Sequence, residues 1–118
     1  MSDYVDGFVL PVPKKNLAAY RKMAAKAGKI WLEHGALEFR ECVGDDLKGM
    51  EGTISFTRVM KLKKGETVFF SWIKFKNRAH RDRVNKKVFA DKRLGDMSDM
   101  PFDPKRMAYG GFKTLVKA

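Results

Sequence analysis

The run from Glu66 to Phe75 constrains the fold more than any other stretch of the chain. It is rich in β-branched and aromatic residues, and strand alternation puts large apolar side chains on both faces: Val68, Phe70 and Trp72 on one, and Phe69, Ile73 and Phe75 on the other. A half-solvated antiparallel sheet alternates apolar with polar residues, and this run does not. Both faces must therefore be covered. The two helices that the rest of the chain supplies cover one face, and we expect a second copy of the chain to close the other.

The composition is that of an ordinary globular chain, which we expect to form a single domain over residues 1–118 without linkers. The length of 118 residues suits one domain, and a hydrophobic fraction of 44% argues against disorder. The one cysteine, Cys42, excludes an intramolecular disulfide and is typical of a reducing compartment. The sequence begins without a signal-peptide pattern, and no apolar stretch approaches the roughly 20 residues that span a bilayer. These features predict a cytoplasmic protein.

Hydrophobic periodicity and turn residues predict the order strand, helix, strand, strand, helix, strand, with one more short strand before the third main strand. The main strands are expected over residues 4–10, 37–43, 66–75 and 107–116, the helices over 14–34 and 78–90, and the extra strand within 53–62. Pro11 should end the first strand, Asn16 and Asn77 should cap the helices, and Gly35 suits the left-handed position after the first helix. An antiparallel sheet with both helices on one face is the ferredoxin-like βαββαβ arrangement, an α+β fold.

The net charge of +11 is concentrated in one part of the sequence. Nine basic and two acidic residues lie between Lys74 and Arg93. This stretch is either a solvated helix face or a nucleic-acid-binding surface. In the second reading, Arg81, Arg83, Lys86 and Lys87 bind phosphates and do not distinguish one nucleotide sequence from another. The stacking strand of RNA recognition modules is broken here, because Lys64 and Gly65 are followed by Glu66 instead of an aromatic residue. Nucleic-acid binding is therefore the weaker of the two readings.

The sequence offers no metal or cofactor motif. His34 and His80 are the only histidines, they lie far apart, and no pair of ligand residues has the spacing of a zinc site. The glycines near residues 44–52 lack the strand-to-helix setting of a phosphate-binding loop. We therefore expect neither a bound metal nor a cofactor.

Three ionisable residues are candidates for acid–base chemistry: His34, Glu41 and Asp6. His34 is expected at the end of the first helix, where the helix dipole favours the imidazolium. Asp6 and Glu41 stand in register with apolar neighbours on their strands, and a carboxylate is costly to bury there without a partner. In a pocket such groups act as general acids and bases. The alternative is structural: His34 caps a turn, and the carboxylates make internal hydrogen bonds.

Aromatic residues predict a pocket for a small ligand between the sheet and the helices. The residues expected to line it, with His34 at its edge, are Tyr20, Trp31, Trp72, Tyr109 and Phe112. Aromatic side chains at these spacings also suit a plain core, and the two readings are compatible because such folds often retain a cavity.

Several long segments resemble one known family. They are residues 31–42 (WLEHGALEFREC), 70–73 (FSWI), 100–112 (MPFDPKRMAYGGF), 4–9 (YVDGFV) and 81–88 (RDRVNKKV), and the chain is similar over nearly its whole length to the YbaA-like family of small bacterial proteins. The resemblance implies a dimeric α+β barrel, in which two ferredoxin-like sheets close face to face. The family is uncharacterised, so the resemblance assigns no catalytic residue.

The sequence therefore predicts a homodimer with a small-molecule pocket, acting as a binding protein or as a cofactor-free enzyme. Nucleic-acid binding through the basic second helix is the alternative, and a structural or regulatory role without a ligand is a third reading. No membrane partner is expected. The sequence alone identifies neither the ligand nor a reaction.

Overall fold

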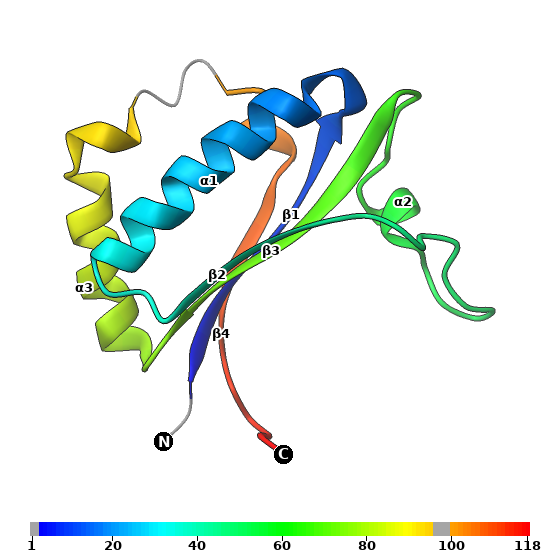
Figure 1. Cartoon of the computed structure of the whole chain (residues 1–118). Coiled ribbons are helices and arrows are strands. Elements are labelled where there is room, and N and C mark those ends of the chain that lie inside the picture. Colours follow the sequence, from blue (N-terminus) through cyan, green and yellow to red (C-terminus); the bar gives the residue numbers. More distant parts are fainter. Residues whose placement is uncertain (1–2, 96–99) are drawn as a thin grey trace.

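The computed structural model describes residues 3–95 and 100–118 and shows an α+β fold. Four strands form one antiparallel sheet in the order β2-β3-β1-β4. Helices α1 and α3 lie on one face of this sheet, and the short helix α2 lies on the other side (Figure 1). The elements are β1 Tyr4–Pro13, α1 Leu17–Glu33, β2 Glu38–Val43, α2 Phe56–Val59, β3 Glu66–Phe75, α3 Arg78–Phe89 and β4 Ala108–Lys113.

Strand β3 has the bounds that the sequence predicted and lies between β1 and β2. Phe69 faces the helices, because its ring packs on Tyr20 of α1 with 4.3 Å between ring centroids. Phe70 and Trp72 therefore lie on the opposite face, where Phe70 remains 47% exposed. We call this second side of the sheet the open face.

Strand β1 is longer than predicted, because it continues through Pro11 to Pro13. Its pairing with β4 stops at Val9, whereas its pairing with β3 runs on to Pro13. One side of β1 thus has no neighbouring strand beyond Val9, and a proline there forfeits no hydrogen bond of the sheet. The expectation that Pro11 ends the strand was wrong for this reason.

The two main helices confirm most of the predicted pattern. Asn77 caps α3 by accepting a hydrogen bond from the backbone N–H of His80 at 2.8 Å, and Gly35 follows α1 with φ of 114°. Asn16 does occupy the position before α1, but its side chain makes no capping bond. Its amide instead donates to the carbonyl of Pro101 at 3.1 Å, which ties the start of α1 to the segment before β4.

The extra strand expected within residues 53–62 does not form; the structure has the short helix α2 there. The Ser55 hydroxyl accepts a hydrogen bond from the backbone N–H of Arg58, and this local cap favours a helical turn. The connection between β2 and β3 projects from the sheet on the side away from α1 and α3 (Figure 1). The last strand, expected over 107–116, is shorter and spans Ala108–Lys113.

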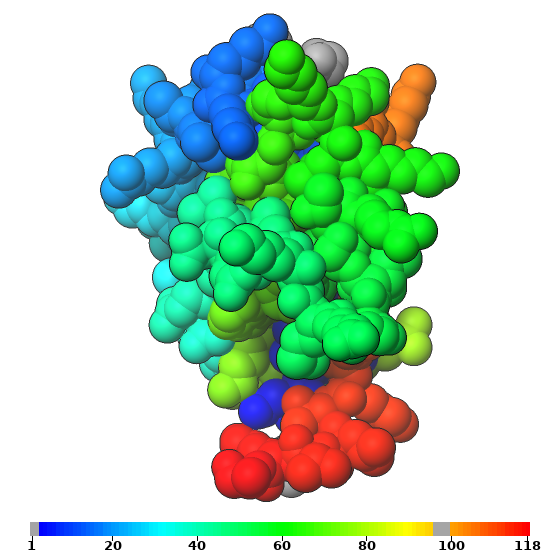
Figure 2. All heavy atoms as spheres, turned by 90° about the vertical axis from the view of Figure 1, so that its right-hand side faces the viewer, coloured from blue at the N-terminus to red at the C-terminus, as the bar shows by residue number. Residues whose placement is uncertain are grey.

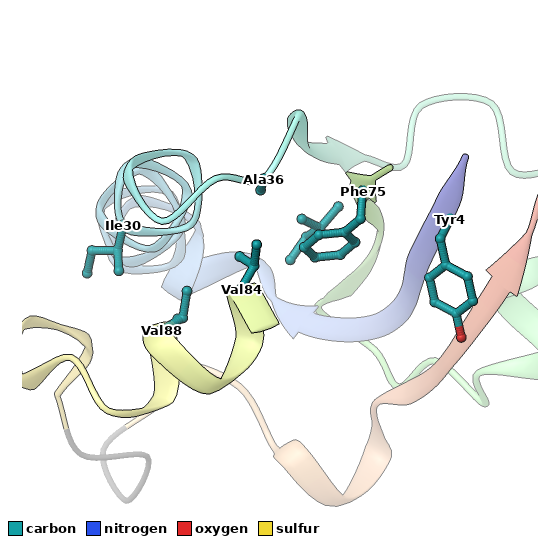
Figure 3. Packing of buried hydrophobic residues seen from close by; sticks show 7 residues of the cluster. Tyr4, Ile30, Ala36, Phe75, Val84 and Val88 are labelled. Carbon is teal, nitrogen blue, oxygen red and sulfur yellow. The ribbon is translucent and has the colours of Figure 1, made fainter. Parts of the chain in front are cut away.

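The core between the sheet and the helices consists of two clusters. One joins the C-terminal part of α1 to α3, and Figure 3 shows Val84 and Val88 of α3 beside Ile30 of α1. The other centres on Tyr20, Ala24 and Phe69. Phe8 packs against both clusters. Residues of both clusters line a pocket.

Candidate functional site

A pocket of about 1170 Å³ lies between the helix-facing side of the sheet and helices α1 and α3. Its wall is mostly apolar, with aromatic rings from both main helices, from β1, β2 and β4, and from the segment before β4; α1 and that segment also supply methionines. Its apolar lining includes Phe8, Trp31, Phe39, Phe102, Met23 and Met107. Polar groups line it at a few places, chiefly around Glu41 and around Asp6.

Glu41 is held by two hydroxyl groups. It lies on the edge strand β2, directly opposite Ser71 of β3. The Tyr20 hydroxyl donates to its Oε1 at 2.8 Å, and the Ser71 hydroxyl donates to the same oxygen. Burial raises the pKa of Glu41 above its ordinary value, while these two hydrogen bonds oppose the rise. The carboxyl group thus has neutral donors beside it and no cation among its hydrogen-bond partners.

Asp6 is more deeply buried, with 1% of its surface exposed. Its Oδ2 accepts a hydrogen bond from the Asn85 amide at 3.3 Å, and its Oδ1 lies 3.7 Å from Nε of Arg81. Burial raises the pKa of Asp6, and the attraction of Arg81 opposes the rise. Asn85 also accepts a hydrogen bond from the Trp31 indole at 3.0 Å, so one amide connects Asp6 to α1.

Arg81 belongs to this buried network, although the sequence placed it among the solvated residues of the basic helix. Its side chain is only 17% exposed. It donates to the hydroxyls of Tyr4 at 2.9 Å and Tyr109 at 3.2 Å, and its Nε also lies 3.3 Å from Asp82. Arg81 lies four residues before Asn85, so both side chains lie on the face of α3 that is turned toward the sheet.

The structure brings together five of the eight residues predicted for acid–base chemistry or for the ligand pocket. Asp6, Tyr20, Trp31, Glu41 and Tyr109 all line the pocket. Three others lie elsewhere. His34 lies at the end of α1, where its Nε2 is 2.8 Å from Asp91. Trp72 and Phe112 lie on the open face, and the Trp72 indole donates to Glu38 at 2.7 Å.

Sequence reasoning missed several pocket residues: Ser71, Asn85, Phe102, Met100 and Met107. The spacing of Arg81, Asn85 and Val88 on one helix was a usable signal for Asn85. Ser71 became recognisable only from its register opposite Glu41. The residues from 100 to 107 show no hydrophobic periodicity, so the sequence offered no reason to predict that they line the pocket.

Two further properties of the described residues, 3–95 and 100–118, concern partners. Among these residues, no group of three or more His, Cys, Asp or Glu side chains lies close enough together to hold a metal ion. None of their helices has the length and apolar character needed to cross a membrane.

The open face is a second notable surface. Phe70 and Phe112 are exposed there, and the Phe112 ring lies close to the backbone of Gly7 and Gly110. The connection between β2 and β3 adds exposed apolar side chains at Met50, Ile54, Phe56 and Val59. Figure 2 views the molecule from this side, with residues of that connection across the middle and the C-terminal residues at the bottom.

Comparison with known proteins identifies relatives of this chain. YbaA of Escherichia coli strain K12 is 43% identical over 114 residues, which cover 96% of this chain and 97% of YbaA, and YbaA of Shigella flexneri matches equally well. Both relatives are described as uncharacterised. Among solved structures, the de novo designed protein Foldit4 aligns over 98% of this chain and 99% of its own, with a TM-score of 0.45 and 10% identity. The model of the family described as a protein of unknown function, DUF1428, matches residues 3–104, and the chain belongs to this family.

Proposed function

We propose that this protein binds a small, largely apolar molecule in the pocket beneath α1 and α3, and that it does so as a homodimer. The observation that carries the proposal is the pocket of about 1170 Å³ with an apolar wall and two buried carboxyl groups. Ligand sites in proteins are typically apolar concavities with a few convergent polar groups. Carboxyl groups whose pKa is displaced cluster at such sites.

The same site supports either simple binding or cofactor-free catalysis. A general acid needs a carboxyl group that holds its proton near neutral pH, and burial displaces the pKa of both Asp6 and Glu41 in that direction. Glu41 is the better acid–base candidate, because its partners are two neutral hydroxyls. Asp6 is engaged by Asn85 and Arg81, which suits a positioning role.

The proposed dimer is an α+β barrel closed through the open face. The strand order β2-β3-β1-β4 with both main helices on one side supports the ferredoxin-like arrangement. The open face combines exposed Phe70 and Phe112 with charges of both signs at its β2 edge, Glu38, Arg40 and Lys74. A surface with both signs can pair with itself across a two-fold axis, and homodimer interfaces commonly bury about 2,000 Å² or more.

Calorimetry with a defined probe tests the pocket. The probe is 2-ethylnaphthalene, an uncharged ring compound small enough for the cavity, and we expect saturable binding with one site per chain. The variant Ala27→Phe adds a ring to the pocket wall and should abolish binding. Its matched control, Ala25→Phe, adds the same ring to an exposed position of α1 that does not line the pocket.

The comparison of the two variants decides the outcome. Loss of binding in Ala27→Phe with retention in Ala25→Phe supports the site, provided that both variants keep the circular dichroism spectrum of the parent. Equal binding by the parent protein and both variants would mean that the probe binds outside this pocket. Absence of binding by the parent protein removes the proposal if 2-acetylnaphthalene, which has the same ring system and a carbonyl group, also fails to bind.

The nucleic-acid alternative has less support. Of its four named residues, Arg81 is engaged by Tyr4, Tyr109 and Asp6, which leaves Arg83, Lys86 and Lys87 exposed on α3. The nucleic-acid alternative would be favoured if the protein bound single-stranded RNA at about 150 mM salt and if replacing these three residues by Gln abolished that binding. We expect no such binding.

A further inference from the structure

We infer that the pocket selects an uncharged, ring-bearing molecule with a carbonyl oxygen, which accepts a hydrogen bond from the protonated carboxyl group of Glu41. This inference rests on the proposed function and deepens it by naming the class of ligand. It follows from three features: the hydrogen bonds of Glu41, the balance of charges around the pocket, and the residues of its wall.

The two oxygens of Glu41 have different surroundings. Oε1 accepts hydrogen bonds from both Tyr20 and Ser71. Oε2 forms no hydrogen bond within the described residues, and it is not among the fully buried atoms that lack a partner. Because Oε1 already accepts two hydrogen bonds, the acidic proton of the neutral carboxyl group belongs on Oε2. That O–H group is then available to a ligand in the pocket.

The groups that face Glu41 favour its neutral form. Tyr20 of α1 and Ser71 of β3 are uncharged donors, and burial raises the pKa of the Tyr20 hydroxyl far above its ordinary value, so that it keeps its proton. Glu41 forms no salt bridge with a basic residue in the described chain, and burial is the largest influence on its pKa. A buried carboxyl group without a cation beside it holds its proton at higher pH than an exposed one.

The remaining charges of the pocket disfavour an anionic ligand. The buried cation, Arg81, is already matched by Asp6 at 3.7 Å and Asp82 at 3.3 Å. Its terminal nitrogens are engaged by two tyrosine hydroxyls. The lysines of the lining, Lys22, Lys26 and Lys86, are exposed to solvent, where an ion pair contributes little. A carboxylate inside the pocket would therefore lose its hydration without gaining a free cation.

The wall of the pocket suits a ring. Phe8, Phe39, Phe102 and Trp31 supply aromatic surfaces, and Met23 and Met107 supply flexible thioethers that adapt to the edges of a ring. Aromatic surfaces and thioethers contribute chiefly through apolar contact and supply no positive charge to an anionic ligand. The carboxyl group of Glu41 then orients the ligand by its carbonyl oxygen.

Three compounds with one ring system test the inference by calorimetry at pH 6. They are 2-acetylnaphthalene, which carries the carbonyl group, 2-ethylnaphthalene, which lacks it, and 2-naphthoate, which carries a negative charge. A net hydrogen bond predicts that the ketone binds about 3- to 10-fold more tightly than the hydrocarbon. The carboxylate should bind most weakly of the three.

Variants at Glu41 assign the preference to this side chain. Glu41→Gln keeps an N–H donor in place of the O–H group, so it should retain the preference for the ketone from pH 6 to pH 9. The parent protein should lose the preference once the pH rises above the raised pKa of Glu41 and the carboxyl group ionises. Glu41→Met has no donor and should show no preference at any pH. Glu38→Gln, on the same strand but on the open face, is the matched control and should behave as the parent does.

The outcomes separate this inference from the proposed function. Equal binding of the ketone and the hydrocarbon, tightest binding of 2-naphthoate, or a preference retained in Glu41→Met would overturn the inference while leaving a small-molecule site in place. Absence of binding by all three compounds would overturn both.

Discussion

The Tyr20 hydroxyl on α1 donates a hydrogen bond to the Glu41 carboxyl group on β2 across 2.8 Å. Tyr20 is buried, and its ring also packs against Phe69 in the second core cluster. This contact joins a helix to the edge strand of the sheet at the polar end of the pocket. The same group of residues thus serves both the fold and the candidate site.

Removing the Tyr20 hydroxyl should lower the free energy of unfolding by about 1 kcal/mol, because one buried hydrogen bond is lost while the ring remains. Urea denaturation of Tyr20→Phe at neutral pH measures the change. Tyr109→Phe is the comparison, and its effect should be smaller because Tyr109 is 51% exposed. Equal changes in the two variants would contradict the role given to the Tyr20 hydrogen bond.

The fold could be predicted from the sequence where local signals were strong. The bounds of β3 followed from its apolar run, and the start of α3 followed from the cap at Asn77. The prediction failed where neighbours decided the outcome. Pro11 stays in a strand because β4 ends early, and Asn16 binds Pro101, which lies 85 residues away in sequence.

The site was predictable only in part, for a similar reason. Asp6 and Glu41 stood out because each is a carboxylate among apolar neighbours on a strand. His34 joins neither of them, because the turn after α1 carries it to Asp91. Arg81 resembled its solvated neighbours in the sequence, and its contacts with Tyr4 and Tyr109 depend on how β1, β4 and α3 pack.

The stability of the protein should depend on the protonation of Glu41. Burial raises the pKa of Glu41 above its ordinary value of 4.5, so the folded state holds this proton more tightly than the unfolded state. The resulting stabilisation is fully present below pH 4.5 and is lost as the pH rises through the folded-state pKa. Glu41→Gln cannot ionise and should therefore gain stability relative to the parent as the pH rises.

Urea unfolding of both proteins between pH 4 and pH 8 measures this difference. Asp6 is present in both proteins, so its own titration largely cancels. The difference in unfolding free energy between Glu41→Gln and the parent protein should grow as the pH rises. A constant difference, or one that changes in favour of the parent protein, would contradict the raised pKa of Glu41.

Arg81 should matter for stability, whereas its basic neighbour Arg83 should not. Arg81→Gln removes the cation that faces Asp6 at 3.7 Å and the donors to two tyrosine hydroxyls, and we expect a loss of about 2–3 kcal/mol in the free energy of unfolding. Arg83 is exposed, and Arg83→Gln should change stability by less than about 0.5 kcal/mol. Chemical denaturation of the two variants measures these changes. Equal losses in the free energy of unfolding would contradict the role given to Arg81 in the buried network.

Two adjacent phenylalanines distinguish the proposed dimer interface from the core. Phe70→Asp places a charge on the open face and should yield a folded monomer, because Phe70 is 47% exposed and packs there against the exposed Phe56 of α2, with 6.0 Å between ring centroids, and not against α1 or α3. Phe69→Asp places the charge beside Tyr20 and should prevent folding, because a buried unpaired charge costs several kcal/mol. Light scattering and circular dichroism report the two outcomes. A monomeric parent protein at micromolar concentration would exclude the dimer.

Nuclear magnetic resonance tests the central claim, a ligand site beneath the helices, most directly. The two tryptophans report on opposite sides of the sheet, since the Trp31 indole binds Asn85 at the pocket and the Trp72 indole binds Glu38 on the open face. Their indole N–H signals are assigned with Trp31→Phe and Trp72→Phe and followed during titration with 2-acetylnaphthalene. We predict a saturable shift of the Trp31 signal with the Trp72 signal unchanged. A shift of Trp72 alone, or of neither signal, would contradict the account.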